Sequence, residues 1–245
     1  MNVAFFKQFQ ALEQTANTIP HIFAEHGYNT AGYGKILHHE TNDSKIWTVE
    51  QINDNWYGYQ NREHASMNAS VFPDQLKPVD SFKDHIFTTR AVDMLRILAS
   101  EPAPFFLGIG YKLPHIELHV PYKYYAMYDN AKSRASFRLN SIRRSHPLHA
   151  PAVAHRESHT RHFYYMNDTG RRRQEFGQPL DKTVGAVFPL RAHIEVMMGY
   201  AAAVSFLDAQ LGRLLDAIEE LDLWKDLVIV LTADHGMHNG EKGTW

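Results

Sequence analysis

The 245-residue sequence predicts an α/β fold in which helices flank a central, largely parallel sheet. Two observations support this class. Helical and strand patterns alternate along the chain, in the order helix, strand, helix, strand, long helix, strand. Each apolar strand pattern also ends in polar side chains. Because parallel strands end at the same edge of a sheet, these polar side chains are expected to gather at one edge.

The first helix and strand are expected within residues 17–34. Residues 17–27 have the signals of a helix, since Pro20 suits a first turn and Gly27 suits a stop. Residues 28–33 follow as an extended strand. The next stretch, 41–80, mixes polar, aromatic and turn-forming residues, and it predicts a long irregular connection.

The middle of the chain repeats this pattern. Apolar residues recur at helical spacing through 80–100 and predict a second helix. A short apolar run, 105–109, predicts a central strand. The region 131–173 carries ten Lys and Arg against two acids and has no clear periodicity, which favours a solvated insertion over a stripe that binds an anionic polymer.

The last predicted pair is the longest helix followed by a buried strand. Residues 192–222 place apolar side chains on one broad helical face. The run 227–231, Leu-Val-Ile-Val-Leu, then predicts a strand that delivers an acid and an imidazole at its carboxyl end.

Composition excludes several classes of function. The chain has no cysteine, which rules out disulfides, thiolate metal sites and a Cys nucleophile in this sequence. A net charge of −2 gives no global reason to expect nucleic acid as a partner. No apolar run approaches the roughly 20 residues of a membrane-spanning helix, and the first residues make a poor signal peptide.

Asp234 and His235 are the candidate metal ligands. The carboxylate suits Ca²⁺ or Mg²⁺, whereas the imidazole fits Zn²⁺ or Mn²⁺ equally well. Two ligands do not complete a site, so further oxygens must come from elsewhere. The alternative is a turn-capping Asp beside a structural His, and the dipeptide alone does not separate the two interpretations.

Two further clusters are candidates for handling an anion. Lys35 follows a glycine-rich turn that lets backbone approach a ligand, and His38 lies three residues later. His115 follows a proline, and Lys112 adds charge nearby, so this loop could protonate a leaving oxygen or bind an anionic one. The alternatives, a surface lysine after a turn and an ordinary loop histidine, stay open at this point.

Together, these segments resemble the sulfatases of the alkaline phosphatase superfamily, and within them the iduronate-2-sulfatase subfamily. The resemblance covers roughly residues 15–125 and 188–245 in the family's order. It is carried by the stretches GKILH, PFFL with GYKLPHI, YAAAVSFLDAQLGRLL, TADHG and GEKGTW.

The resemblance implies a hydrolase of sulfate esters in sulfated sugars and glycosaminoglycans, with a divalent cation that is usually Ca²⁺, Mg²⁺ being the alternative. By position, Asp234 and His235 match metal ligands. Lys35 and His38 match residues that contact the sulfate and the catalytic formylglycine. His115 matches the histidine that binds sulfate and assists departure of the alcohol, and Lys112 stands one position before the family's lysine, where this chain has Leu113.

The resemblance also leaves parts of the family pattern without a counterpart. The formylglycine nucleophile arises from a C/S-x-P-x-R motif, and neither a cysteine nor room for that motif precedes residue 15. We therefore expect 1–245 to be a partial sulfatase catalytic domain with a basic variable insertion at about 131–187. Alone it should be inactive, and an N-terminal segment or partner chain would complete it.

Two other functions remain open at this stage. One is a non-catalytic relative that binds sulfated glycans through its basic region. The other is a phosphodiesterase or phosphonate hydrolase of the same superfamily. The resemblance implies a lysosomal or secreted location, and the Asn-x-Ser/Thr sequons at Asn42, Asn68 and Asn167 agree with it.

Overall fold

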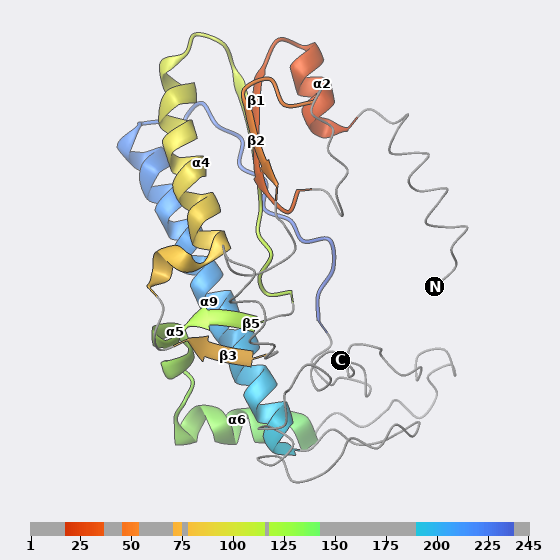
Figure 1. Cartoon of the computed structure of the whole chain (residues 1–245), viewed down its shortest axis with the longest axis vertical. Coiled ribbons are helices and arrows are strands. Elements are labelled where there is room, and N and C mark those ends of the chain that lie inside the picture. Colours follow the sequence, from red (N-terminus) through yellow and green to blue (C-terminus); the bar gives the residue numbers. More distant parts are fainter. Residues whose placement is uncertain are drawn as a thin grey trace, which may run out of the picture. The chain divides into compact units, whose positions relative to one another are not determined.

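A computed structural model of the chain describes residues 18–36, 46–53, 71–74, 78–115, 118–142 and 190–237, and the statements below refer to these residues (Figure 1). The chain divides into two compact units, each of which is described by itself. The first unit comprises 1–56, 86–111 and 212–225, and the second comprises 57–85, 112–211 and 226–245.

The first unit contains a three-stranded parallel sheet, which confirms the predicted sheet type. Its strands are β1 (Asn29–Gly34), β2 (Glu50–Asn53) and β4 (Phe105–Gly110), in the order β2-β1-β4. Strands β1 and β4 are the two predicted near residues 28–33 and 105–109. Strand β2 falls inside the stretch predicted as irregular, so that prediction was wrong there. In the described sheet β4 lies at the end of the order rather than at its centre.

Helix α2 (Ile19–Glu25) leads into β1 and lies within the predicted helix of residues 17–27, two residues shorter at each end. Thr18 is the N-cap residue, Pro20 lies in the first turn, and Gly27 follows the helix at φ +82°. The Phe23 ring stacks on Phe106 of β4, with centroids 5.0 Å apart. The helix therefore packs on the sheet through an aromatic pair.

Two glycines, one on β1 and one on β4, leave room for the Trp47 ring against this sheet. Gly32 and Gly108 are register partners on β1 and β4. A Cβ atom on Gly32 would lie 2.6 Å from the Trp47 ring, and one on Gly108 would lie 3.4 Å from it. Trp47 is 8% exposed. The small residues thus make space for an indole that no larger pair would admit.

Two long helices confirm the helical predictions. Helix α4 (Lys83–Ser100) follows a 3-10 turn, η1 (Val79–Ser81), and helix α9 spans Leu190–Glu220. Within the first unit, Arg213 of α9 donates a hydrogen bond to the Thr89 hydroxyl of α4 at 2.7 Å. Neither these nor the other described helices combine the length and apolarity that a bilayer crossing requires.

The second unit holds elements that the sequence did not predict. Strands β3 (Val71–Asp74) and β5 (Leu118–Pro121) pair in parallel, and α5 (Tyr122–Ala126) follows β5 directly. Helix α6 (Ala131–Ile142) occupies the start of the basic region, where a loop was expected; the rest of that region lies outside the described residues. The buried core of this unit is Phe82, Leu113, Leu118, Val120, Tyr125, Val196, Met198, Ala202, Ala203 and Phe206.

The predicted last strand is not formed, so the sequence prediction for 227–231 was wrong. The segment has no strand assignment, and its side chains face solvent: Val228 is 91% exposed and Val230 is 79% exposed. An apolar run becomes a strand only when another strand supplies the ladder of backbone hydrogen bonds. Within the described residues none of the strands pairs with this segment.

A polar network joins α5, α6 and α9 in the second unit. The Tyr125 hydroxyl donates to the Glu195 carboxylate, and Arg134 donates to Glu195 at 3.1 Å and to Asp129 at 2.8 Å. Tyr125 is 6% exposed. Burial, and then the hydrogen bond to Glu195, raise the pKa of Tyr125 well above its usual range.

This network predicts a loss of stability at alkaline pH. Because the pKa of Tyr125 is higher in the folded chain than in the unfolded one, its contribution is fully present below pH about 10 and falls as the pH rises further. The free energy of unfolding, measured with urea between pH 8 and 11, should therefore fall more steeply with pH for the wild type than for Tyr125→Phe. Tyr122→Phe, on the same helix but 37% exposed, should follow the wild type. Equal slopes for Tyr125→Phe and wild type would contradict this account.

Candidate anion-handling site

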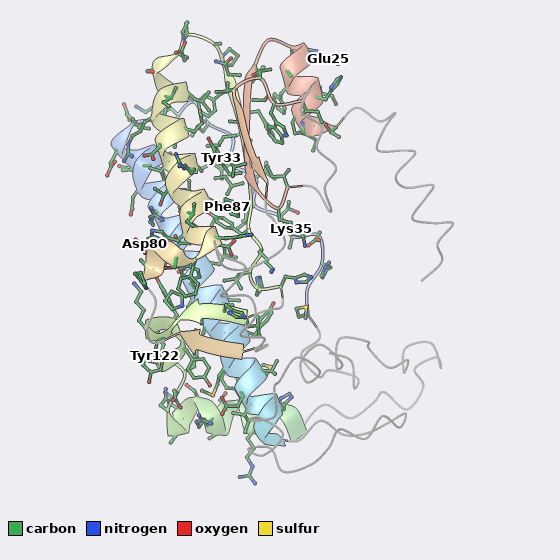
Figure 2. All side chains as sticks on the ribbon, in the orientation of Figure 1. Glu25, Tyr33, Lys35, Asp80, Phe87 and Tyr122 are labelled. Atoms are coloured by element: carbon green, nitrogen blue, oxygen red, sulfur yellow. The ribbon has the colours of Figure 1, made fainter. Side chains whose placement is uncertain are left out.

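Lys35 is fixed at the carboxyl end of β1 by a close approach of two backbones. Its N–H donates to the Gly110 carbonyl at 2.6 Å. A Cβ on Gly34, which has φ +80°, would lie 2.2 Å from that same carbonyl oxygen, and one on Gly110 would lie 2.1 Å from Lys35 backbone. Figure 2 shows Lys35 just beyond the strand, with Phe87 of α4 nearby. Both glycines are therefore required for the position of Lys35.

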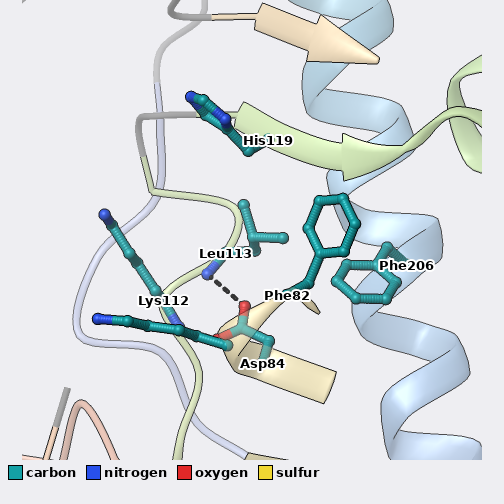
Figure 3. A pocket seen from close by; sticks show the side chains of 7 residues that line it. Phe82, Asp84, Lys112, Leu113, His119 and Phe206 are labelled. Carbon is teal, nitrogen blue, oxygen red and sulfur yellow. Dashed lines mark hydrogen bonds between the residues drawn. The ribbon is translucent and has the colours of Figure 1, made fainter. Parts of the chain in front are cut away.

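Lys112 and His115 share a loop that follows β4 in sequence. The loop turns tightly, since the His115 N–H donates to the Lys112 carbonyl at 2.9 Å, and the Leu113–Pro114 peptide bond is cis. Asp84, in the first turn of α4, accepts the N–H groups of Lys112 and Leu113 at 3.0 Å each. The Asp84 carboxylate is thus a fixed attachment point for the loop, and Figure 3 shows one of these two bonds.

A small surface hollow adjoins this loop in the second unit. Figure 3 shows the Lys112 side chain at the left, His119 of β5 at the top, and the Phe82 and Phe206 rings at the right. His119 is 3% exposed. The lining residues are Phe82, Lys83, Asp84, Lys112, Leu113, His119 and Phe206. The hollow is too small for a ligand of ordinary size, but its two lysines and one histidine are side chains that can contact the oxygens of an anion.

The candidate metal ligands lie together but do not complete a cation site. Asp234 and His235 are exposed, with 3.7 Å between the His235 Nε2 and the Asp234 Oδ2 atoms. The His235 N–H also donates to Asp234 Oδ1 at 3.0 Å. Across the described part of the chain, no cluster of three or more His, Asp or Glu has an arrangement that could hold a metal. These two residues alone do not fit the six or more oxygen ligands that Ca²⁺ takes.

The structure thus brings the predicted site residues together only in groups. Lys112 and His115 share one loop, and Asp234 and His235 are adjacent in the same unit. Lys35 belongs to the first unit, and His38 lies outside the described residues. Sequence reasoning missed Asp84. Acidic residues are common in the first turn of a helix, and the local sequence does not show which of them bind a distant backbone.

Comparisons with known proteins point to one family. The sulfatase family model matches residues 1–245. Iduronate 2-sulfatase of Homo sapiens is 29% identical over 94% of this chain and 42% of its own. A sulfatase of Formosa agariphila is 26% identical over 93% of this chain and 43% of its own. The chain therefore spans less than half the length of these relatives.

A solved structure shows the same fold. The crystal structure of a phosphonate monoester hydrolase of Agrobacterium radiobacter superposes with a TM-score of 0.50 at 15% sequence identity, covering 93% of this chain and 48% of that one. The described parallel sheet and its helices thus share the α/β fold of that hydrolase.

Proposed function

Because the chain belongs to the sulfatase family, we propose that it recognises sulfate esters of sulfated sugars, glycosaminoglycans among them, as an iduronate-2-sulfatase-like hydrolase relative. We further propose that the 245-residue chain alone binds these esters without hydrolysing them. Support for this second part comes from the sequence, which has no Cys-x-Pro-x-Arg or Ser-x-Pro-x-Arg motif from which a formylglycine nucleophile could form.

The observation that carries the proposal is the anchored loop with Lys112 and His115. Its backbone is held by Asp84 at two points, so the imidazole of His115 and the ammonium of Lys112 start from a fixed main chain. Lys112 would offset negative charge on the sulfate, and His115 would donate a hydrogen bond to the ester oxygen. Only where a nucleophile from outside these 245 residues attacked the sulfur would His115 pass its proton to the departing alcohol. Lys35, fixed at the end of β1, and His38 would contribute further contacts to the sulfate.

A divalent cation, Ca²⁺ or Mg²⁺, belongs to the proposal, with Asp234 and His235 as two of its ligands. When bound, such an ion would polarise the sulfate oxygens. Because the described residues supply no third ligand, each step proposed for this chain uses only its own side chains.

A phosphonate hydrolase is the second candidate function, favoured by the fold likeness to the phosphonate monoester hydrolase. Sulfate and phosphonate esters both present tetrahedral anionic oxygens, so the same lysines could hold either one. A non-catalytic relative would instead retain sulfated glycans through basic residues such as Arg171, Arg172 and Arg173. A lysosomal or secreted location, and a segment or partner chain that completes the site, are also part of the proposal.

The function is tested by binding and turnover with the purified chain. A sulfated iduronate disaccharide should bind, and Lys35→Ala and His115→Ala should each weaken it about tenfold, since each removes one charged or hydrogen-bonding contact. Lys225→Ala, at an exposed lysine, should bind like the wild type. Hydrolysis of 4-methylumbelliferyl sulfate should be absent both with Ca²⁺ and with EDTA.

Three outcomes would change this proposal. Unchanged affinity for the sulfated disaccharide in both Lys35→Ala and His115→Ala would show that these residues do not form the anion site. Tighter binding of a phenylphosphonate ester than of the sulfated sugar would favour the phosphonate hydrolase. Binding lost only when Arg171, Arg172 and Arg173 are replaced would favour the glycan-binding relative.

A further inference from the structure

We infer that Asp84 is a positioning residue that holds the His115 loop in its anion-binding conformation, an inference that rests on the proposed function. Asp84 lies in the first turn of α4, and the residue is 4% exposed. Its carboxylate accepts hydrogen bonds from the backbone of the loop that carries Lys112 and His115.

The geometry of the carboxylate suits this role. One oxygen, Oδ1, accepts the Lys112 N–H at 3.0 Å, and the other, Oδ2, accepts the Leu113 N–H at 3.0 Å. Two adjacent N–H groups, 28 and 29 residues along the chain from Asp84, are thus bound by one planar group. Hydrogen bonds to a charged acceptor are stronger than neutral ones, and burial strengthens them further.

The same bonds extend to His115. The His115 N–H donates to the Lys112 carbonyl at 2.9 Å, so a displacement of the Lys112 backbone would also displace His115. Leu113 between them is 8% exposed and packs in the core of the second unit. The loop is therefore held on two sides, by an apolar side chain in the core and by a buried carboxylate on its backbone.

Asp84 also has a favourable position for a buried charge. The first turn of a helix presents unpaired N–H groups and the positive end of the helix dipole, both of which stabilise a carboxylate. A neutral amide at this position would lose that interaction. It would also present an NH₂ group to one of the two backbone donors. Shape alone therefore cannot replace the carboxylate.

Amide hydrogen exchange in the full 245-residue chain, measured by NMR, tests the bonds directly. In Asp84→Ala, exchange at Lys112 and Leu113 should accelerate by about tenfold or more. In Asp84→Asn, one of the two amides should keep its protection, because a single oxygen remains. Asp93→Ala, which removes an exposed acid of the same helix, should leave both rates unchanged.

A second readout separates positioning from simple support of the fold. Inorganic sulfate is titrated while the His115 ring resonances are followed, at a temperature where wild type and variant are both fully folded. Asp84→Asn should then bind sulfate about tenfold more weakly. Unchanged exchange at Lys112 and Leu113, or unchanged sulfate affinity in Asp84→Asn, overturns the inference. If sulfate fails to shift His115 even in the wild type, the proposed sulfate site fails, and accelerated exchange still supports the hold of Asp84 on the loop.

Discussion

Gly34→Ala should lower the free energy of unfolding by about 3 kcal/mol. Two costs add. The backbone at position 34 has φ +80°, where a Cβ atom is strained, and the new methyl group would meet the Gly110 carbonyl oxygen at 2.2 Å. The same carbonyl accepts the Lys35 N–H, so a shift that relieves the clash would weaken the hydrogen bond that joins the ends of β1 and β4. Urea unfolding at constant pH measures this loss.

Gly27→Ala is the matched control, because it isolates the first of the two costs. Gly27 has φ +82°, almost the same conformation, yet a Cβ there would meet nothing within 4 Å. Its expected loss is about 1 kcal/mol, from the backbone strain alone. Equal losses for Gly34→Ala and Gly27→Ala would show that the close approach to Gly110 contributes nothing.

Phe206→Ala should cost about 3–5 kcal/mol of stability. Phe206 is fully buried on α9, with its ring 5.7 Å from Phe82 and 5.2 Å from Tyr124 between centroids. The alanine would leave a cavity between aromatic side chains that cannot collapse to fill it, since each is held by its own element. Thermal or urea unfolding measures the effect, and probes of the second unit should report it.

Val204→Ala provides the comparison on the same helix. Val204 lies two residues from Phe206 and is 44% exposed, so its truncation should change stability by no more than about 0.5 kcal/mol. A similar effect for both substitutions would indicate that α9 does not bury the face that contains Phe206. Together the pair measures how strongly the two faces of the helix differ.

The elements that could be predicted from the sequence are those with local signals. Helix α2 has a proline at its start and a glycine at its end, and α4 and α9 carry long apolar stripes, so periodicity alone locates them. Strands β2, β3 and β5 have four residues each and form only by pairing with distant residues, which no local pattern reveals.

The same distinction explains the candidate site. Lys35 and His115 were found because they stand beside glycine and proline, which mark turns. The close approach of Gly34 to Gly110 could not be predicted, because it joins residues of two strands. Asp84 was missed because its contacts are likewise distant in sequence, 28 and 29 residues along the chain. The segment 227–231 shows the converse, since a strong local strand signal produced no strand where the described residues offer no partner.

Because the run 227–231 is exposed, we expect the oligomeric state of the chain to depend on its concentration. Two copies that meet along this segment could form the backbone ladder that each lacks, and Leu-Val-Ile-Val-Leu has the β propensity that favours such stacking. Asp226 and Asp234 flank the run. They should oppose this pairing, because stacked copies in register would bring like charges together. High ionic strength, which screens those charges, is therefore the condition under which the chain should first self-associate.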